Sequence, residues 1–505
     1  MSIRSGGLST LLGLLVLSAV DRSFAEPESD TYDTPALEVH AVASGLNRPW
    51  GLAFLPGGDL LVTAKNGGLY RLPEGRGPAT EIGGLPDDID RRLETVIDNS
   101  GLFDIAVDPD FESTRRVFLS YASAGDGGSA LKVSSFLLSG DRLREQRTLL
   151  LAGPRSPDRF HYGGALLPLT DGTLLVSSGE RHAFEKPQGS SPVAQDPGDL
   201  RGKMLRIRYD GTVPEDNPFV GRQAYDPRVY ALGVRNSQGI ARSSSGDILF
   251  SEHGPRAGDE LNGLRPGQNY GWPLQTCGNY KDRDYRAPTA SQVDIAPPLA
   301  CWSDITYAPA GITFYESDSI PGWKDRLLVA GLSAGYLLLV TLEDKRVTDV
   351  QSLFEGRQRR LRDVAVAPDG SVYLALDGED GGVLRLSVGA SMSAGEPMIS
   401  VEERPEPWLP CLQCHSTAGD AGENTMSLAN LLGRPAASEA GVEYSEALRT
   451  SGIVWTESLL ERYLADPDRL VPGTTMPVRI DDPDARRKIV EYIVSLGNTS
   501  GPARR

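Results

Sequence analysis

A strand–turn–strand unit recurs six times before residue 389, and this repeat limits the possible folds more than any other feature. In each unit a short apolar run leads into a turn rich in Pro, Asp and Gly, and a second apolar run follows. The units lie at Trp50–Thr63, Phe103–Phe111, Ala165–Val176, Ile240–Phe250, Ile312–Ala330 and Val364–Leu374. Regular short strands separated by turns are typical of a β-propeller, whereas a β-sandwich would give fewer, less regular repeats. We therefore predict an all-β six-bladed β-propeller over residues 37–388.

The repeats stop near Val388, and the chain then changes character. Residues 389–407 contain much Gly, Ala, Ser and Pro, which is the composition of a linker. Shortly after it, Cys411-Leu-Gln-Cys414-His415 has the Cys-x-x-Cys-His pattern of c-type haem attachment. The two thiols can form thioethers with one porphyrin, and the histidine can reach the iron. A redox dithiol does not need this histidine, and a zinc site would need a second ligand pair, which nothing nearby supplies.

The second iron ligand is expected at Met476. Cytochromes c bind the haem iron with His on one side and Met on the other, and Met476 follows a Pro-Gly-Thr-Thr segment. A core methionine beside a proline turn is the alternative. Apolar residues at helical spacing predict an amphipathic helix over residues 484–496.

From Cys411 to about Leu496 the sequence resembles a class I cytochrome c of the mitochondrial and bacterial type. The segments that carry the resemblance are Leu428–Arg434, Tyr444-Ser445, Trp455, Tyr463 and Pro472–Met476. The resemblance implies a small all-α cytochrome c domain with covalent haem c, which we place at residues 408–500.

The first 25 residues predict export. Arg4 supplies a positive start, Leu11–Val20 is mostly apolar, and Ser23-Phe-Ala25 is a small-x-small cleavage site. The apolar run is shorter than the about 20 residues that span a bilayer, and no later run is long enough. We therefore expect residues 1–25 to be a signal peptide and the protein to have no transmembrane segment. Covalent haem attachment outside the cytoplasm then points to a bacterial periplasm.

Export also bears on the remaining cysteines. With Cys411 and Cys414 assigned to haem, Cys277 and Cys301 are left as an even pair in an oxidising compartment, so a disulfide is expected. Two free buried thiols are the alternative. The formal net charge of −17 argues against nucleic acid as a partner, because its backbone selects basic surfaces.

Two neighbouring segments of the repeat region, His253–Asn262 and Gln268–Pro273, resemble the soluble quinoprotein sugar dehydrogenases. That family consists of six-bladed propellers that use pyrroloquinoline quinone (PQQ) and calcium. Supporting segments are Leu46–Trp50, Ala194–Asp196, Leu200–Arg206, Gly233–Gly239 and Arg360–Val364. The resemblance covers about residues 40–388 and keeps the order of the family's motifs.

The resemblance implies a PQQ site on the propeller. The quinone carries three carboxylates, which Arg235, Arg360 and Arg362 can bind as fixed guanidinium forks. Solvated surface arginines are the alternative. Asn236 matches a position that contacts the cofactor, and so does Asn99.

The resemblance also implies two calcium sites. Gly254 and Pro255 match positions whose backbone carbonyls hold the catalytic calcium, a hard cation that polarises the quinone carbonyl. Glu260, Tyr270 and Asp282 match positions for a structural calcium, with Asp282 lying past a small length difference. A turn carboxylate that faces water is the alternative for this second site.

His161 matches the general base of the family. A near-neutral imidazole can take the substrate hydroxyl proton while hydride leaves the substrate carbon for the quinone. A structural histidine is the alternative. His40 and His182 lack a motif, and His253 precedes the calcium turn, which it is expected to brace.

The sequence departs from the family at four positions. Asn99 replaces Gln or Glu, Phe160 replaces an acidic residue, Ala165 replaces Arg, and Ser333 replaces a Lys that faces the cofactor. The loss of Lys removes one charge partner of the quinone. These changes leave the reaction class intact, but they argue against assuming that glucose is the substrate.

The expected function is therefore that of an exported quinohaemoprotein dehydrogenase. The propeller would oxidise a sugar or related alcohol with PQQ and calcium and pass electrons to the haem. The haem would deliver them to a periplasmic cytochrome, copper protein or oxidase. Two alternatives remain: a propeller with a decayed quinone site, serving as a binding module on an electron carrier, and a calcium-dependent lactone hydrolase.

Overall fold

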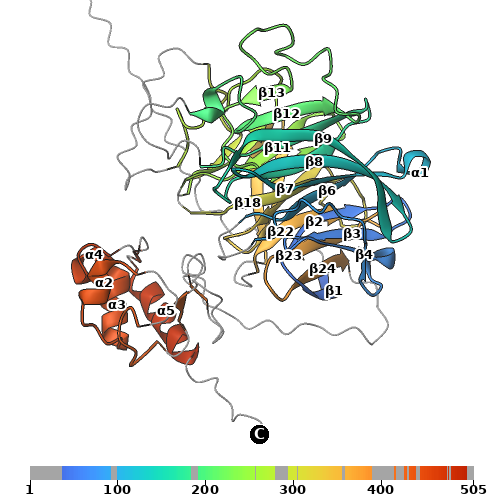
Figure 1. The fold of residues 1–505 in the computed structure, drawn as a ribbon. Coiled ribbons are helices and arrows are strands. Elements are labelled where there is room, and N and C mark those ends of the chain that lie inside the picture. The colour runs from blue at the N-terminus through green and yellow to red at the C-terminus, as the bar shows by residue number, and fades with distance from the viewer. Residues whose placement is uncertain are drawn as a thin grey trace, which may run out of the picture.

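The structure is a computed structural model (Figure 1). It describes residues 37–92, 99–182, 192–255, 257–278, 294–303, 305–354, 359–388, 415–416, 426–428, 431–438, 444–474, 476, 479–480 and 482–496. The predicted signal peptide, the predicted linker, Cys411, Cys414 and Asp282 lie outside these residues.

The described residues before 389 form six four-stranded antiparallel sheets, the blades of a propeller. From the inner to the outer strand, blade 1 consists of β2 (Pro49–Phe54), β3 (Leu60–Ala64), β4 (Gly68–Leu72) and β5 (Thr80–Glu81). Blade 2 consists of β6 (Leu102–Val107), β7 (Arg116–Gly125), β8 (Gly128–Ser139) and β9 (Arg142–Ser156). Blade 3 consists of β10 (Gly163–Pro168), β11 (Thr173–Ser178), β12 (Lys203–Arg208) and β13 (Val229–Leu232). Blade 4 consists of β14 (Gly239–Arg242), β15 (Ile248–Glu252), β16 (Asp259–Gly263) and β17 (Ala300–Trp302). Blade 5 consists of β18 (Pro309–Tyr315), β19 (Arg326–Gly331), β20 (Leu337–Glu343) and β21 (Arg346–Leu353). Blade 6 consists of β22 (Leu361–Val366), β23 (Val372–Leu376), β24 (Gly381–Val388) and β1 (Leu37–Leu46). Short helical turns are η1 (Pro73–Gly75), α1 (Phe111–Thr114) and η3 (Val193–Gln195).

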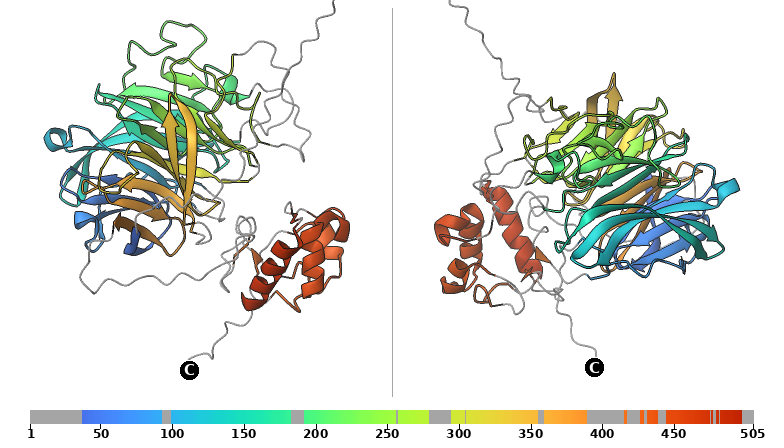
Figure 2. Two further views of the ribbon diagram at one scale, coloured as in Figure 1. Left: turned by 180° about the vertical axis from the view of Figure 1, so that it is seen from behind. Right: turned by 45° about the horizontal axis from the view of Figure 1, so that its top comes forward.

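The blades close into a ring. Each innermost strand contacts the next in the order β2, β6, β10, β14, β18, β22, and β22 contacts β2 again (Figures 1 and 2). The last blade takes three strands from the end of the repeat region and its outer strand, β1, from the beginning, with Leu37 opposite Val388. This pairing joins the two ends of the domain, and the structure confirms the predicted six-bladed β-propeller.

Apolar cores lie between neighbouring blades, which explains the continuous apolar runs in the sequence. One core joins blades 1 and 2 around Leu61 and Leu119, the next joins blades 2 and 3 around Phe103 and Leu174, and four more follow around the ring. Because a strand is covered by a blade on each face, both of its faces are apolar and the usual alternation of polar and apolar residues is lost. Burial of these faces is the main driving force for packing.

Hydroxyl groups on the second strands tie each of the first four blades to the next one. Thr63 donates to the carbonyl of Phe103, Ser120 to Gly164, Ser177 to Ser237, and Ser251 to Ala310. The corresponding positions in blades 5 and 6 hold Ala330 and Ala375, which cannot donate.

At the closure of the ring, a carboxylate makes the hydrogen bond that links one blade to the next. Asp363 of β22 accepts the backbone N–H of Leu52 in blade 1 at 2.7 Å and that of Val364 at 2.9 Å. The neighbouring strand of blade 5 has Gly311 opposite this carboxyl group, and a Cβ there would overlap Asp363 Oδ1. A side chain at residue 311 would therefore displace the group that joins the last blade to the first.

We expect Gly311→Ala to lower the free energy of unfolding by about 2–4 kcal/mol, through overpacking and loss of the Asp363 hydrogen bond to Leu52. Chemical denaturation followed by tryptophan fluorescence measures this change. Gly57→Ala is the control, because a Cβ at residue 57 meets no atom within 4 Å. Equal denaturation midpoints for the two variants would contradict a role of Gly311 in ring closure.

The C-terminal region contains α2 (Glu446–Thr450), α3 (Glu457–Ala465), α4 (Pro467–Leu470) and α5 (Pro483–Leu496). The side chains of Ser445, Thr456 and Asp466 accept backbone N–H groups at the starts of α2, α3 and α4. The helix expected over residues 484–496 is confirmed as α5. The described residues also include one parallel pair of two-residue strands, β25 (His415–Ser416) and β26 (Met426–Ser427), which the all-α prediction did not include.

These helices have a core of their own. Leu448, Trp455, Leu460, Ile489 and their neighbours form one buried cluster, all from residues after 427, and Met476 packs against it half-buried. Among the described residues no helix is both long enough and apolar enough to cross a membrane.

Candidate active site

The propeller topology gathers the predicted site residues on one face. The innermost strand of each blade starts at this face, and the antiparallel second strand ends there. His161 precedes β10, Arg235 and Asn236 precede β14, and Arg362 is the second residue of β22. Asn99 precedes β6 and Gly254 follows β15, so segments far apart in the sequence contribute to one surface.

A cavity of about 240 Å³ lies among the innermost strands. Trp50, Asp104, Gln238, Arg362 and Asp363 contribute to its wall. Both aspartates are half-buried and accept backbone N–H groups at 2.7–2.9 Å. Burial raises the pKa of Asp104 to about 7, and burial together with Asp104 raises that of Asp363 well above its usual value. The two carboxyl groups therefore bind backbone N–H groups of the innermost strands. Arg362 places a positive charge in the cavity wall.

His161 is held as a neutral imidazole. Its side chain is 12% exposed, and Nδ1 lies 2.5 Å from Oε1 of the buried Glu180. Burial lowers the pKa of His161 well below its usual value, and the positive charges of Arg235 and Arg181 and the nearby His182 act in the same direction. In the neutral ring Nδ1–H donates to Glu180, which leaves the lone pair of Nε2 as a proton acceptor.

Sequence reasoning missed Glu180. It lies two residues after the end of β11, the second strand of blade 3, and its backbone N–H donates to the carbonyl of Arg235 at 2.9 Å. In an antiparallel hairpin the residues before the first strand lie beside those after the second strand. The expected register of this hairpin could therefore have pointed to Glu180 as a partner of His161.

His182, which has no motif, packs against the predicted base. Its ring meets that of His161 edge-on, with 4.1 Å between centroids, and stacks on Phe160 at 4.7 Å. The imidazole of His161 is therefore fixed by a carboxylate at Nδ1 and by an aromatic neighbour. Phe160, which replaces an acidic residue of the family, gives this side of the site an aromatic surface.

The three predicted arginines differ in burial. Arg235 and Arg362 are buried, with their guanidinium groups 5.0 Å from the ring centre of Trp272 and 4.1 Å from that of Trp50. In the described part of the chain neither Nε has a hydrogen-bond partner. Arg360 is 43% exposed. The first two arginines are therefore buried cations with an unused donor each.

The other donors of these arginines bind nearby groups. Arg362 donates to Gln238 at 2.6 Å and to Asp377 at 2.8 Å, and Arg360 donates to the same carboxylate oxygen of Asp377 at 3.2 Å. Arg235 donates to the carbonyls of His253 at 3.1 Å and Gly254 at 2.7 Å. Sequence reasoning missed Asp377, which joins two of the arginines.

The two predicted asparagines have different partners. Asn236 accepts the N–H of Gly163 at 3.1 Å and lies 3.5 Å from Nδ1 of His253, so it connects the strand after His161 to the calcium turn. Asn99 accepts a hydrogen bond at 3.2 Å from Lys65, a buried lysine that sequence reasoning did not consider.

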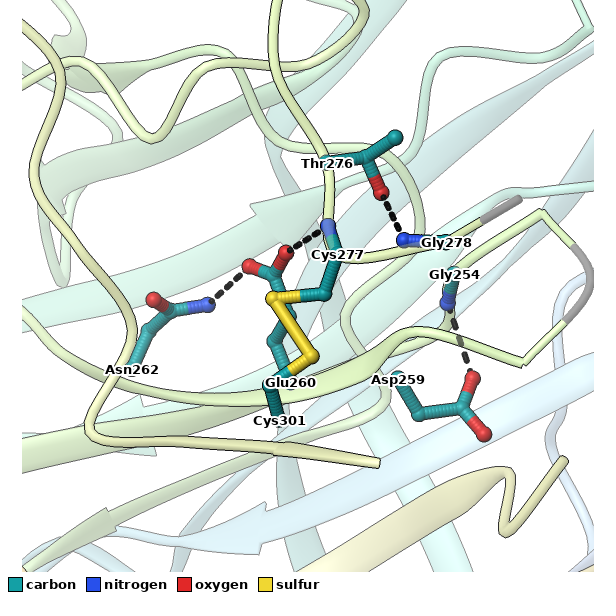
Figure 3. The surroundings of a disulfide bond; sticks show 8 residues. All are labelled: Gly254, Asp259, Glu260, Asn262, Thr276, Cys277, Gly278 and Cys301. Carbon is teal, nitrogen blue, oxygen red and sulfur yellow. Dashed lines mark hydrogen bonds between the residues drawn. A yellow bond between two sulfur atoms is a disulfide. The ribbon is translucent and has the colours of Figure 1, made fainter. Parts of the chain in front are cut away.

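Two of the predicted calcium residues, Gly254 and Pro255, lie in the turn after β15, and Figure 3 shows Gly254 near Asp259. The carbonyl of Gly254 already accepts from the guanidinium of Arg235, so this oxygen points toward a positive charge, and its N–H donates to Asp259 at 2.8 Å. Pro255 is the next residue of the same turn. Within the described ranges no group of three or more His, Cys, Asp or Glu side chains can hold a metal. A calcium ion here would therefore depend on backbone carbonyls.

The side chains expected at the structural calcium have protein partners. Glu260 accepts from the N–H of Cys277 at 3.2 Å and from Asn262 at 3.1 Å. The hydroxyl of Tyr270 donates to the carbonyl of Gly263 at 2.6 Å. The third expected residue, Asp282, is not among the described residues.

Cys277 and Cys301 form a disulfide, as expected, with 6.3 Å between their Cα atoms (Figure 3). Cys301 lies on β17 opposite Glu260 of β16, and Cys277 donates its N–H to the same Glu260. The disulfide therefore links the segment after the family motif to β17, the strand next to the one that carries Glu260.

Known proteins resemble both parts of the chain. Residues 46–385 match the family described as glucose/sorbosone dehydrogenase. Aldose sugar dehydrogenase YliI of Escherichia coli is 33% identical over 360 residues, which are 70% of this chain and 93% of that protein. The solved structure of the PQQ-bound form of aldose sugar dehydrogenase from Streptomyces coelicolor superposes with a TM-score of 0.56 at 31% identity, covering 70% of this chain and all of that one.

The C-terminal region matches different proteins. Cytochrome c2 iso-2 of Magnetospirillum molischianum is 37% identical over 89 residues, which are 17% of this chain and 90% of that protein. The chain thus joins a region homologous to cytochromes c to a propeller, and by that propeller it belongs to the glucose/sorbosone dehydrogenase family.

Proposed function

We propose that the protein is an exported dehydrogenase that oxidises an aldose sugar or related alcohol with PQQ and calcium and passes the electrons to a covalently bound c-type haem in the same chain. The observation that carries this proposal is the neutral His161, oriented by Glu180 and close enough to the buried Arg235 for its charge to act on the imidazole. A proton acceptor beside buried cations suits a reaction in which an alcohol loses a proton and a hydride.

The residues fit an anionic quinone. Arg235 and Arg362 are buried and each retains an unused Nε donor, and a fork of N–H groups is suited to carboxylates. Arg360 and Asn99 would complete the quinone contacts from the exposed edge and from blade 2, and Asn236 would hold the turn between them. When bound, the quinone accepts the hydride and calcium polarises the carbonyl that receives it.

Gly254 and Pro255 would hold the catalytic calcium through backbone carbonyls. The Gly254 oxygen accepts a hydrogen bond from the Arg235 guanidinium, so calcium would bind its second lone pair. Glu260, Tyr270 and Asp282 remain our proposal for a structural calcium, with the Glu260 carboxylate as its anionic member.

His161 would remove the proton. Its Nε2 can accept the hydroxyl proton of the substrate, while Nδ1–H stays bound to Glu180 and the carboxylate stabilises the imidazolium that forms. The ring of His182 keeps the imidazole from rotating. This chain's own residues therefore supply the base, its orientation and the charges for the cofactor.

The C-terminal region would carry the electrons onward. Cys411 and Cys414 would attach haem c, with His415 and Met476 as iron ligands, and Met476 packs beside the core of the helices. A linker over residues 389–407 would raise the effective concentration of haem near the propeller. A periplasmic cytochrome, copper protein or oxidase would accept the electrons.

A spectrum of the purified protein tests the proposal. Addition of a panel of aldoses should reduce the haem only when PQQ and calcium are both present. If no sugar reduces either the haem or an artificial dye, the propeller is a binding module instead. If lactones are hydrolysed with calcium alone, the propeller is a hydrolase.

A further inference from the structure

Lys65 is a buried lysine at the proposed cofactor face that no family motif includes. It follows β3 directly and is 3% exposed, although lysine is almost never fully buried unless it is paired. Its N–H donates to the carbonyl of Arg48 at 2.9 Å, and its carbonyl accepts from Leu102 at 3.3 Å. Gly101 has φ +114°, and a Cβ there would overlap the Lys65 carbonyl oxygen. The backbone of Lys65 is therefore fixed from both sides.

The ammonium group uses few of its donors. Nζ donates to Asn99 at 3.2 Å and lies 5.8 Å from the ring centre of Trp50, the same ring that carries Arg362. An ammonium has three N–H donors, and within the described residues we find one hydrogen bond for them. The side chain therefore has donors left for a ligand.

The charges around Lys65 are mostly positive. Arg48 lies before β2, Arg360 and Arg362 lie at the start of β22, and Asp377 follows β23. The carboxylates near these four cations are Asp377, the exposed Glu379, which pairs with Arg48 at 3.4 Å, and Asp363, whose charge acts on Arg362. The cations therefore outnumber the carboxylates when Lys65 is protonated.

Two of these neighbours also have unused donors. The Nη1 of Arg48 and the Nε of Arg362 are buried and have no hydrogen-bond partner in the described part of the chain. Burial lowers the pKa of Lys65 to about 7, Asp377 opposes this shift, and Arg362, Arg48 and Arg360 add to it. Asp377, the carboxylate whose charge acts on Lys65, is already bound by Arg360 and Arg362.

Blade order explains how Lys65 can stand in for the missing lysine of the family. That lysine is replaced by Ser333, in the turn after β19 of blade 5, whose N–H donates to the carbonyl of Tyr307 at 3.2 Å. Blade 6, with Arg360 and Arg362, lies between blade 5 and blade 1. A side chain of blade 5 or of blade 1 can therefore contact a ligand that is bound at these arginines. Lys65 belongs to blade 1.

We propose that Lys65, together with Arg362 and Arg48, binds a carboxylate of the anionic quinone and thereby replaces the lysine that Ser333 has displaced. This inference rests on the proposed function, because the ligand is the cofactor of that function. Binding of the anion stabilises the protonated amine, so Lys65 takes up a proton when the quinone binds.

The test is calorimetric titration of the calcium-loaded protein with PQQ in two buffers of different ionisation enthalpy. We expect proton uptake at pH 8, where the free amine is mostly neutral, and little at pH 6, where it is already protonated. At pH 8 Asp377 stays charged, and His161 and His253, whose pKa values burial lowers, stay neutral. Lys65→Met should abolish the uptake and weaken PQQ binding about 10–100-fold.

Stability without PQQ separates this role from a structural one. Lys65→Met removes a buried cation from like charges, so the quinone-free variant should unfold at the same or a higher denaturant concentration than wild type. Lys345→Met is the control, because this exposed lysine pairs with Asp247 at the opposite face. If wild type and Lys65→Met bind PQQ with the same affinity and the same proton uptake, Lys65 does not bind the quinone carboxylate. The proposed function of the protein would stand in that case. If wild type binds no PQQ, both are wrong.

Discussion

His161→Ala should lower sugar-dependent dye reduction by about 10²–10⁴-fold, the usual contribution of a positioned proton acceptor. Binding of PQQ should change little, because Arg235 and Arg362 carry the charges for the cofactor. The haem should remain reducible by dithionite, since the C-terminal helices have their own core. Steady-state dye reduction with an oxidisable aldose measures the effect.

The pH profile gives a second readout for His161. The base must be neutral to act, and its pKa lies well below the usual value because of burial and the charge of Arg235. Wild-type activity should therefore stay level from neutral pH to below the usual histidine range and fall only in more acidic solution. Glu180→Gln should keep PQQ binding but lower the rate, because the imidazole loses its carboxylate partner.

His40→Ala is the matched control, since His40 lies on β1, the outermost strand of blade 6. It should keep wild-type dye reduction. Full activity of His161→Ala with a sugar that wild type oxidises would show that another group is the base.

His415→Ala should have the opposite effect. Sugar-dependent reduction of a small dye should stay within about twofold of wild type, because the cores between the blades contain only propeller residues. Reduction of a soluble c-type cytochrome should be lost, since the haem iron loses its histidine ligand. Parallel assays with the dye and with the cytochrome separate the two steps.

Met398→Ala is a suitable control, because this methionine belongs to the predicted linker. It should keep both activities. If His415→Ala still reduces the cytochrome at the wild-type rate, electrons pass directly from the propeller to the cytochrome. The haem of this chain is then not required for electron transfer.

The blades can be recognised from the local sequence. Apolar runs such as Leu60–Ala64 and Leu327–Ala330 are visible because each strand is covered on both faces, so burial appears as continuous hydrophobicity in the local sequence. The Cys-x-x-Cys-His pattern and the Cys277–Cys301 pair were likewise readable, since their chemistry follows from residue type and count. The family motif also located His161 and Arg235 without any structure.

The groups that meet at the site and at the ring closure can be identified only in the folded protein. Glu180 faces His161, Lys65 donates to Asn99 near the arginines of blade 6, and neither Glu180 nor Lys65 belongs to a motif. Asp363 binds the backbone of Leu52, which is 311 residues away in sequence. The physical reason is that a propeller brings the ends of many strands to one face and its last blade beside its first. The partners of a buried charge are then set by the order of blades in space, which local sequence patterns do not record.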